Sequence, residues 1–102
     1  MNLIIKVEFE VYPTDAPEIL TWQEAINYCK KLGEGWRLPS KEELSFMYLE
    51  HKKGLGGFIE GIYVSSSEYN RSNIWFQYFN DGGQEYFGKG RISRVRAVRD
   101  IK

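Results

Sequence analysis

The stretch Gly33-Glu34-Gly35-Trp36-Arg37-Leu38-Pro39-Ser40-Lys41-Glu42-Glu43-Leu44 joins two predicted helices. Gly33 can end the first of them, because glycine readily takes the left-handed conformation of a C-terminal cap. Ser40 and Glu43 form a capping box, S-K-E-E, directly after Pro39, and such a box marks the start of a helix. The stretch therefore predicts the end of one helix and the beginning of the next within a short connection.

The helix before this connection begins at another capping box. Thr21 opens the sequence T-W-Q-E with Glu24, and apolar residues then recur at helical spacing: Trp22, Ala25, Ile26, Cys29 and Leu32. We predict a helix from Thr21 to about Leu32. The helix that starts at Ser40 leads into Leu44, Met47 and Tyr48 and stops before the glycines at 54, 56 and 57, so we expect it to be the shorter one.

Strands are predicted on both sides of the helices. Apolar and polar residues alternate from Leu3 to Val11, which is the period of a strand with one buried face. After Gly54, short runs predict strands over 62–64, 74–79 and 95–98, with a hairpin turn at residues 80–83. A strand, two helices and then short strands with long loops indicate an α+β domain with a loop-rich C-terminal half.

Composition bounds the functions that the chain can have. We take residues 1–102 as a single ligand-binding domain, with 42% hydrophobic residues to fill a core. Fourteen basic and fourteen acidic side chains cancel, so no general attraction to nucleic acid or acidic membranes is expected. A local candidate for anionic ligands is the basic group near the C-terminus: Lys89, Arg91, Arg94, Arg96, Arg99 and Lys102.

The residues that support catalysis or metal binding are scarce. The only histidine, His51, lies beside Lys52 and Lys53 at a helix end, where we expect a solvated helix C-terminus without a catalytic role. Cys29 lies on an apolar helical face, which predicts a buried thiol and no disulfide. We therefore expect no enzymatic activity, no metal and no cofactor. No apolar run approaches the ~18 residues of a membrane span, so no membrane insertion is expected.

The segment from Tyr69 to Ser93 is rich in aromatic, polar and arginine side chains, which dominate binding hot spots. Its large residues alternate with Trp75 and Phe79, which we place in the core. Other residues predicted to be buried are Trp22, Ile26, Cys29, Trp36, Leu38, Leu44, Val95 and Val98. The predicted ligand-binding residues, on one surface, are Tyr69, Arg71, Asn73, Phe76, Tyr78, Tyr86, Phe87, Arg91 and Ser93. The same residues could stack on bases, but zero net charge and the absence of a known motif oppose a nucleic-acid ligand.

Several motifs in order resemble a known family. They are W-Q-E-A-I-N-Y-C-K-K-L (22–32), the connecting stretch 33–44, Y-V-S-S-S-E-Y (63–69), I-W-F-Q-Y-F-N-D-G (74–82) and R-V-R-A-V-R (94–99). Together they resemble the domain that ends the Legionella collagen-like adhesin and recurs in bacterial surface proteins. The resemblance covers about 21–101 and implies a C-type-lectin-like fold, with two helices packed on a small, mostly antiparallel sheet. The family's usual Tyr-Trp is Tyr63-Val64 here, a difference in packing.

The C-terminal half also resembles the variable proteins of diversity-generating retroelements, whose template-derived segment is rewritten at adenines. That pattern would fix Trp75, Phe79, Gly82, Lys89, Arg94 and Arg96, and would vary 70–73, 76, 78, 80, 81, 83, 86–88 and 90–93. Every residue at the variable positions is reachable by rewriting the adenines of an asparagine codon.

These resemblances imply a protein or polysaccharide ligand on a surface and leave two interpretations open. One is a diversified binding face; the alternative is an adhesin-type domain for sulfated polysaccharide or another surface polymer. The calcium-binding motifs of sugar-binding relatives are absent, so we expect calcium-independent binding. A cell surface or phage particle would suit either interpretation, although the sequence itself leaves the location unknown.

Overall fold

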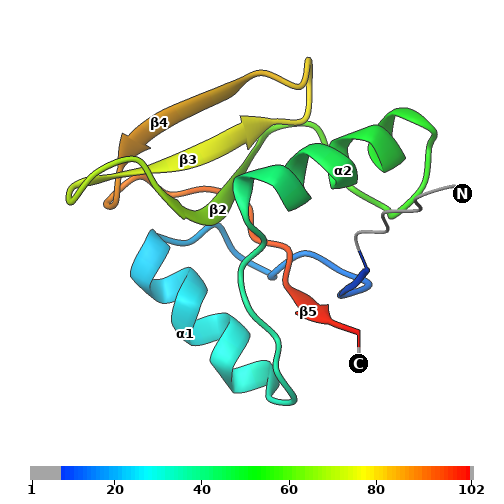
Figure 1. Cartoon of the computed structure of the whole chain (residues 1–102), viewed down its shortest axis with the longest axis horizontal. Coiled ribbons are helices and arrows are strands. Elements are labelled where there is room, and N and C mark those ends of the chain that lie inside the picture. Colours follow the sequence, from blue (N-terminus) through cyan, green and yellow to red (C-terminus); the bar gives the residue numbers. More distant parts are fainter. Residues whose placement is uncertain (1–7, 102) are drawn as a thin grey trace, which may run out of the picture.

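The computed structural model describes residues 8–101 and places two helices on opposite faces of a small antiparallel sheet (Figure 1). This confirms the predicted α+β class. Neither helix among these residues is long and apolar enough to cross a membrane. The elements in chain order are β1 (Phe9–Val11), α1 (Trp22–Leu32), α2 (Lys41–Lys52), β2 (Ile62–Glu68), β3 (Asn73–Tyr78), β4 (Gln84–Gly88) and β5 (Val98–Asp100).

Both predicted capping boxes form. The backbone N–H of Glu24 donates to the Thr21 hydroxyl, and that of Glu43 donates to the Ser40 hydroxyl at 3.1 Å. Each cap satisfies donors at a helix start that would otherwise lack a partner. The helix boundaries are confirmed, but α2 is one residue longer than α1 and not shorter, as we had expected.

The predicted strands are confirmed in part. β2 and β3 form an antiparallel pair and the predicted hairpin turn joins β3 to β4, with the N–H of Gly82 donating to the Tyr78 carbonyl at 2.9 Å. Gly82 has a φ of +83°, a backbone conformation that favours glycine. The sequence missed β4. Of the first predicted strand, 3–7 lie outside the described residues and only Phe9–Val11 forms β1.

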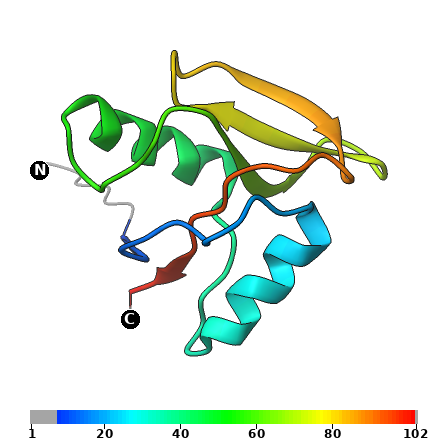
Figure 2. The ribbon, with the colours of Figure 1, turned by 180° about the vertical axis from the view of Figure 1, so that it is seen from behind.

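The prediction of a strand over 95–98 was wrong, because only Val98 belongs to a strand. Residues 93–98 instead bond to several neighbours in turn. Ser93 exchanges backbone hydrogen bonds with Leu20, the N–H of Val64 donates to Arg94, and Val98 exchanges bonds with Arg37. This segment therefore ties the N-terminal residues to the sheet through the middle of the molecule (Figure 2).

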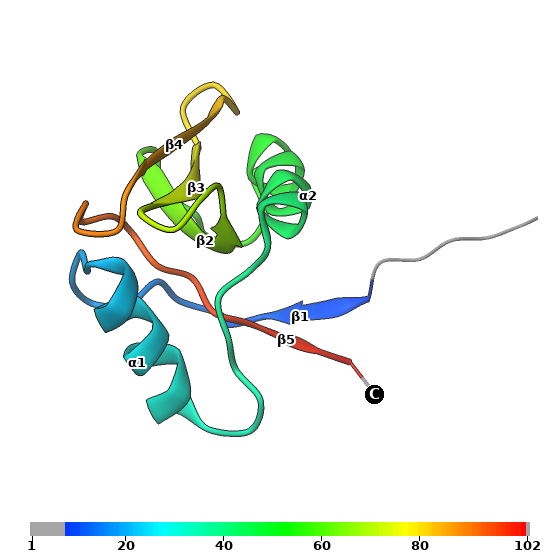
Figure 3. The ribbon, with the colours of Figure 1, turned by 60° about the vertical axis from the view of Figure 1, so that its left-hand side comes forward.

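Two buried clusters fill the interior on the two faces of β2–β3–β4. On the α1 face lie Ala25, Cys29, Leu38, Val64, Ile74, Phe76, Val95 and Ala97. On the α2 face lie Leu44, Met47, Tyr63, Phe79 and Val98. Tyr63 and Val64, where the family usually has Tyr-Trp, thus serve different clusters. β1 and β5 pair with each other to one side of this sheet (Figure 3).

Most of the predicted core is confirmed. Cys29, Leu38, Leu44, Phe79, Val95 and Val98 are buried. Burial raises the pKa of the Cys29 thiol to about 11, so the thiol is protonated at neutral pH. Trp22, Ile26, Trp36 and Trp75, which we also expected to be largely buried, have intermediate exposure, and the first three pack against the α1-face cluster. His51 lies in the last turn of α2, as predicted, and is half-buried, with its ring 5.5 Å from that of Phe79.

Candidate ligand-binding site

The two faces of β3 carry different side chains from those that the sequence predicted. Ile74 and Phe76 are fully buried on the α1 face, whereas Trp75 points to the other face and is partly exposed. Side chains of a strand alternate between its faces. We predicted from the sequence that Trp75 lies in the core, which puts Phe76 on the surface. In the structure Phe76 is the fully buried residue and Trp75 is the partly exposed one. Ile74-Trp75-Phe76 is a continuous apolar run, and such a run does not reveal which face is buried.

The predicted binding residues consequently do not share one surface. Phe76 and Ser93 are buried, so the expectation that they are accessible was wrong. Phe87 lies opposite Ile74 and packs on the α1-face cluster, and the Arg91 guanidinium stacks on its ring at 4.2 Å. Tyr78 is half-buried on that face too, opposite Ile62.

On the opposite face, three aromatic side chains meet: Tyr69, Trp75 and Tyr86, which we call the outer aromatic cluster. The rings of Tyr69 and Tyr86 stack with centroids 3.8 Å apart and planes at 2°. Trp75 contacts both edge to face, at 5.6 Å and 5.5 Å. Tyr69 is 49% and Tyr86 46% exposed, so the stack is open to solvent.

Backbone pairing brings the cluster together. Trp75 lies directly opposite Tyr86 in the β3–β4 register, where cross-strand side chains are neighbours. Tyr69 follows a register shift in β2, and its N–H donates to the Asn73 carbonyl at 2.9 Å. The turn after it is held by Asn70, whose side-chain oxygen accepts from the N–H of Asn73 at 2.9 Å. The rings are thus fixed before any ligand arrives.

The N-terminal end of α2 borders the cluster. Lys41, the first residue of α2, holds its ammonium 4.0 Å from the Trp75 ring centroid, within range of a cation–π contact. The Lys41 backbone carbonyl accepts a hydrogen bond from the Gln84 side-chain amide at 2.9 Å. The same amide also donates to the side-chain oxygen of Gln77 beneath the helix. The sequence missed both Lys41 and the exposure of Trp75, since only the register and the start of α2 bring them together.

The other border is the β2–β3 turn. Arg71 is exposed there, and Asn73 is half-buried with its amide donating to Asn70 at 3.0 Å. The neighbouring Tyr69 hydroxyl raises the pKa of Tyr86 above its usual value of 10, so this phenol is neutral at physiological pH. The face therefore offers aromatic surface and the neutral phenol of Tyr86, with Lys41 at one border and Arg71 in the turn at the other.

Three of the basic residues near the C-terminus, Lys89, Arg96 and Arg99, have acidic partners. Arg96 is 1% exposed and its Nε lies 2.7 Å from Asp15. Arg99 pairs with Glu10 and Glu34, and Lys89 pairs with Glu68. Arg37, which lies outside this group, pairs with Glu43 in the same way. These pairs neutralise the charges of Lys89, Arg96 and Arg99 locally, so these three residues do not form an open anion-binding surface.

The remaining chemistry of the described residues is sparse. Within 8–101, no group of three His, Cys, Asp or Glu side chains is placed to hold a metal ion.

A family model described as the Lcl C-terminal domain matches residues 7–99. No curated protein matches the chain.

Proposed function

Because the chain belongs to the Lcl C-terminal domain family, an adhesin-related family, we propose that it is a non-enzymatic module that binds a surface ligand through the outer aromatic cluster. The observation that carries this proposal is the stacked pair of half-exposed tyrosines. Exposed aromatic groups of this size on a soluble domain mark a site that something covers.

The cluster has the physical properties of a binding hot spot. Tyrosine offers a large contact area with few rotatable bonds, so little conformational entropy is lost when a ligand orders it. Stacking between Tyr69 and Tyr86 and the edge contacts from Trp75 restrict the rings further. Binding energy would come from aromatic burial and from hydrogen bonds to the phenol hydroxyls.

A more specific form of the proposal is that the chain is the variable protein of a diversity-generating retroelement. Most positions expected to vary are exposed: 70–72, 80, 81, 83, 86, 88 and 90–92. None of the six positions expected to be fixed is exposed. This separation supports the interpretation, because diversification is tolerated where it leaves packing intact. Phe76 and Ser93 are buried exceptions, where only residues that fit the core would be accepted.

The variable-protein interpretation makes a prediction about the neighbouring DNA. We expect a near-identical copy of the segment that encodes Tyr69 to Arg99, with differences only at adenines. Sequencing the flanking region tests this directly. A flanking region that carries no such copy, or a copy whose differences fall on other bases, would leave the adhesin-type interpretation.

The alternative ligand is a sulfated polysaccharide or another surface polymer. Lys41 and Arg71 beside the cluster favour a polyanion, whereas the pairing of Arg96, Arg99 and Lys89 with carboxylates opposes it. The two ligand classes differ in salt dependence. Affinity for a polyanion falls steeply as ionic strength rises, and affinity that rests on aromatic burial does not.

A further inference from the structure

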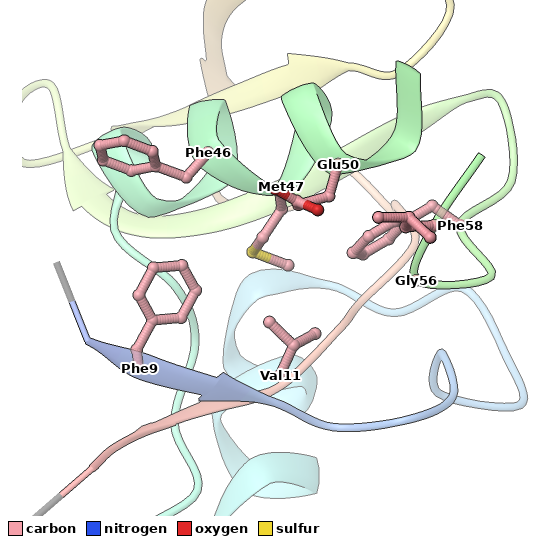
Figure 4. Close-up of a pocket in the computed structure, with 8 residues that line it drawn as sticks. Phe9, Val11, Phe46, Met47, Glu50, Gly56 and Phe58 are labelled. Carbon is pink, nitrogen blue, oxygen red and sulfur yellow. The ribbon is translucent and has the colours of Figure 1, made fainter. Parts of the chain in front are cut away.

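A groove of about 350 Å³ lies between β1 and α2 (Figure 4). Phe9 and Val11 point into it from β1, and Met47 points into it from α2. Its rim carries Phe46 and Leu55, which are 45% and 53% exposed. The groove is therefore an apolar surface that borders a strand, separate from the residues of the outer aromatic cluster.

The pairing of β1 with β5 shows which backbone groups of β1 remain open. The N–H of Tyr12 donates to the Ala97 carbonyl at 2.9 Å, so in this register Glu10 and Arg99 form the next hydrogen-bonded pair. Val98, opposite Val11, exchanges both of its backbone hydrogen bonds with Arg37 instead.

Phe9 and Val11 therefore direct their N–H and C=O groups away from β5. Within residues 8–101, no backbone or side-chain group bonds to them. An open strand edge of this kind is a template for another strand.

We propose that this edge binds a second copy of the chain, with the two β1 strands antiparallel about a two-fold axis at Glu10. In this arrangement Phe9 of one copy lies opposite Val11 of the other. Each of these residues has an open donor and an open acceptor, so each pair exchanges both hydrogen bonds. A two-fold contact requires a surface complementary to itself, and this edge meets that requirement.

Side chains on the groove face match as well. Phe9 and Val11 become cross-strand apolar neighbours, a pairing that stabilises antiparallel strands. The two-fold axis runs perpendicular to the joined sheet, so both grooves lie on the same side of it. The exposed rims at Phe46 and Leu55 of both copies then border one continuous apolar surface.

Charge does not oppose the contact. The two Glu10 side chains meet across the axis on the other face of the sheet, where like charges would repel each other. Each Glu10, however, accepts from the Arg99 Nε of its own chain at 2.7 Å, which neutralises it. The whole chain carries zero net charge, so two copies do not repel each other at long range.

Amide hydrogen exchange of the intact chain at rising concentration tests this proposal. We expect the exchange of the Phe9 and Val11 amides to slow at least tenfold as sedimentation shows dimers forming. The Glu10 amide, which already bonds to β5, is the internal control and should not change. Val11→Pro removes an outward donor and should weaken association at least tenfold, whereas Val11→Thr keeps that donor and should still associate.

Three results would overturn the proposal. The first is a monomer at every concentration with fast exchange at Phe9 and Val11. The second is protection of these two amides in the monomer itself, which would mean that another part of the chain covers the edge. The third is a dimer in which exchange at Phe9 and Val11 stays fast, which would place the contact elsewhere.

Discussion

Replacing Arg96 by methionine is expected to lower the free energy of unfolding by about 3–5 kcal/mol, as for other buried ion pairs that lose one partner. Arg96 is 1% exposed and its guanidinium bonds to the Asp15 carboxylate and to the carbonyls of Gly56 and Gly57. Asp15 also accepts from the Tyr63 hydroxyl at 2.6 Å. Without Arg96, the mostly buried Asp15 carboxylate loses its charge partner. The hydrogen bonds that connect residue 96 to residue 15 and to residues 56–57 are also lost.

Urea unfolding of the variant and of two controls checks this expectation. Arg96→Lys keeps the charge but not the planar array of donors, so an intermediate loss is expected. The double variant Arg96→Met with Asp15→Asn removes the unpaired charge and should recover part of the stability. If Arg96→Met unfolds at the urea midpoint of the parent, the buried network does not contribute to stability.

Phe76→Ala is expected to lower the free energy of unfolding by about 3–5 kcal/mol, the usual loss for a buried aromatic side chain. Phe76 is fully buried and its ring lies 5.6 Å from that of Phe87. The neighbouring Trp75→Ala is the matched comparison. Because Trp75 is partly exposed, its replacement should cost only about 1–2 kcal/mol, from reduced burial and lost ring contacts.

The comparison of these two variants decides whether Phe76 or Trp75 is the more deeply buried aromatic side chain of β3. Urea midpoints measured side by side are sufficient, since both changes remove an aromatic ring from one strand. A larger loss for Trp75→Ala than for Phe76→Ala would restore the orientation that the sequence predicted. It would also remove the outer aromatic cluster as a surface feature.

Local signals in the sequence were sufficient to predict the helices. Each helix begins at a capping box whose two residues are three apart, and those bonds form almost independently of the rest of the chain. The hairpin turn is local in the same way. The expectation that α2 is the shorter helix failed because α2 runs to Lys52, and the ring contacts of His51 with Phe58 and Phe79 at that end join residues that no local pattern brings together.

The binding face was harder to predict, because it depends on pairing between distant residues. The apolar run at 74–76 fits either face of a sheet, and the choice is made by packing against α1. β4 was missed because Gln84 and Glu85 weaken its strand pattern, although the partner strand β3 holds it in place. Arg96 was grouped with surface cations, since its partner Asp15 lies 81 residues away.

The most direct test of the proposed function compares ligand binding by the parent chain and by the double variant Tyr69→Ser/Tyr86→Ser. Calorimetry would measure the affinity of each protein for two probes: heparin, which is a sulfated polysaccharide, and collagen. The double change removes the exposed stack and should lower the free energy of unfolding by only about 1 kcal/mol, the value of an aromatic pair. Tyr78→Ser, on the opposite face, is the matched control. We predict that the parent and Tyr78→Ser bind the same probe with similar affinity and that the double variant loses at least tenfold. Equal binding by the double variant and the parent, or binding of neither probe by the parent, would contradict the assignment of the outer aromatic cluster as the site for such a ligand.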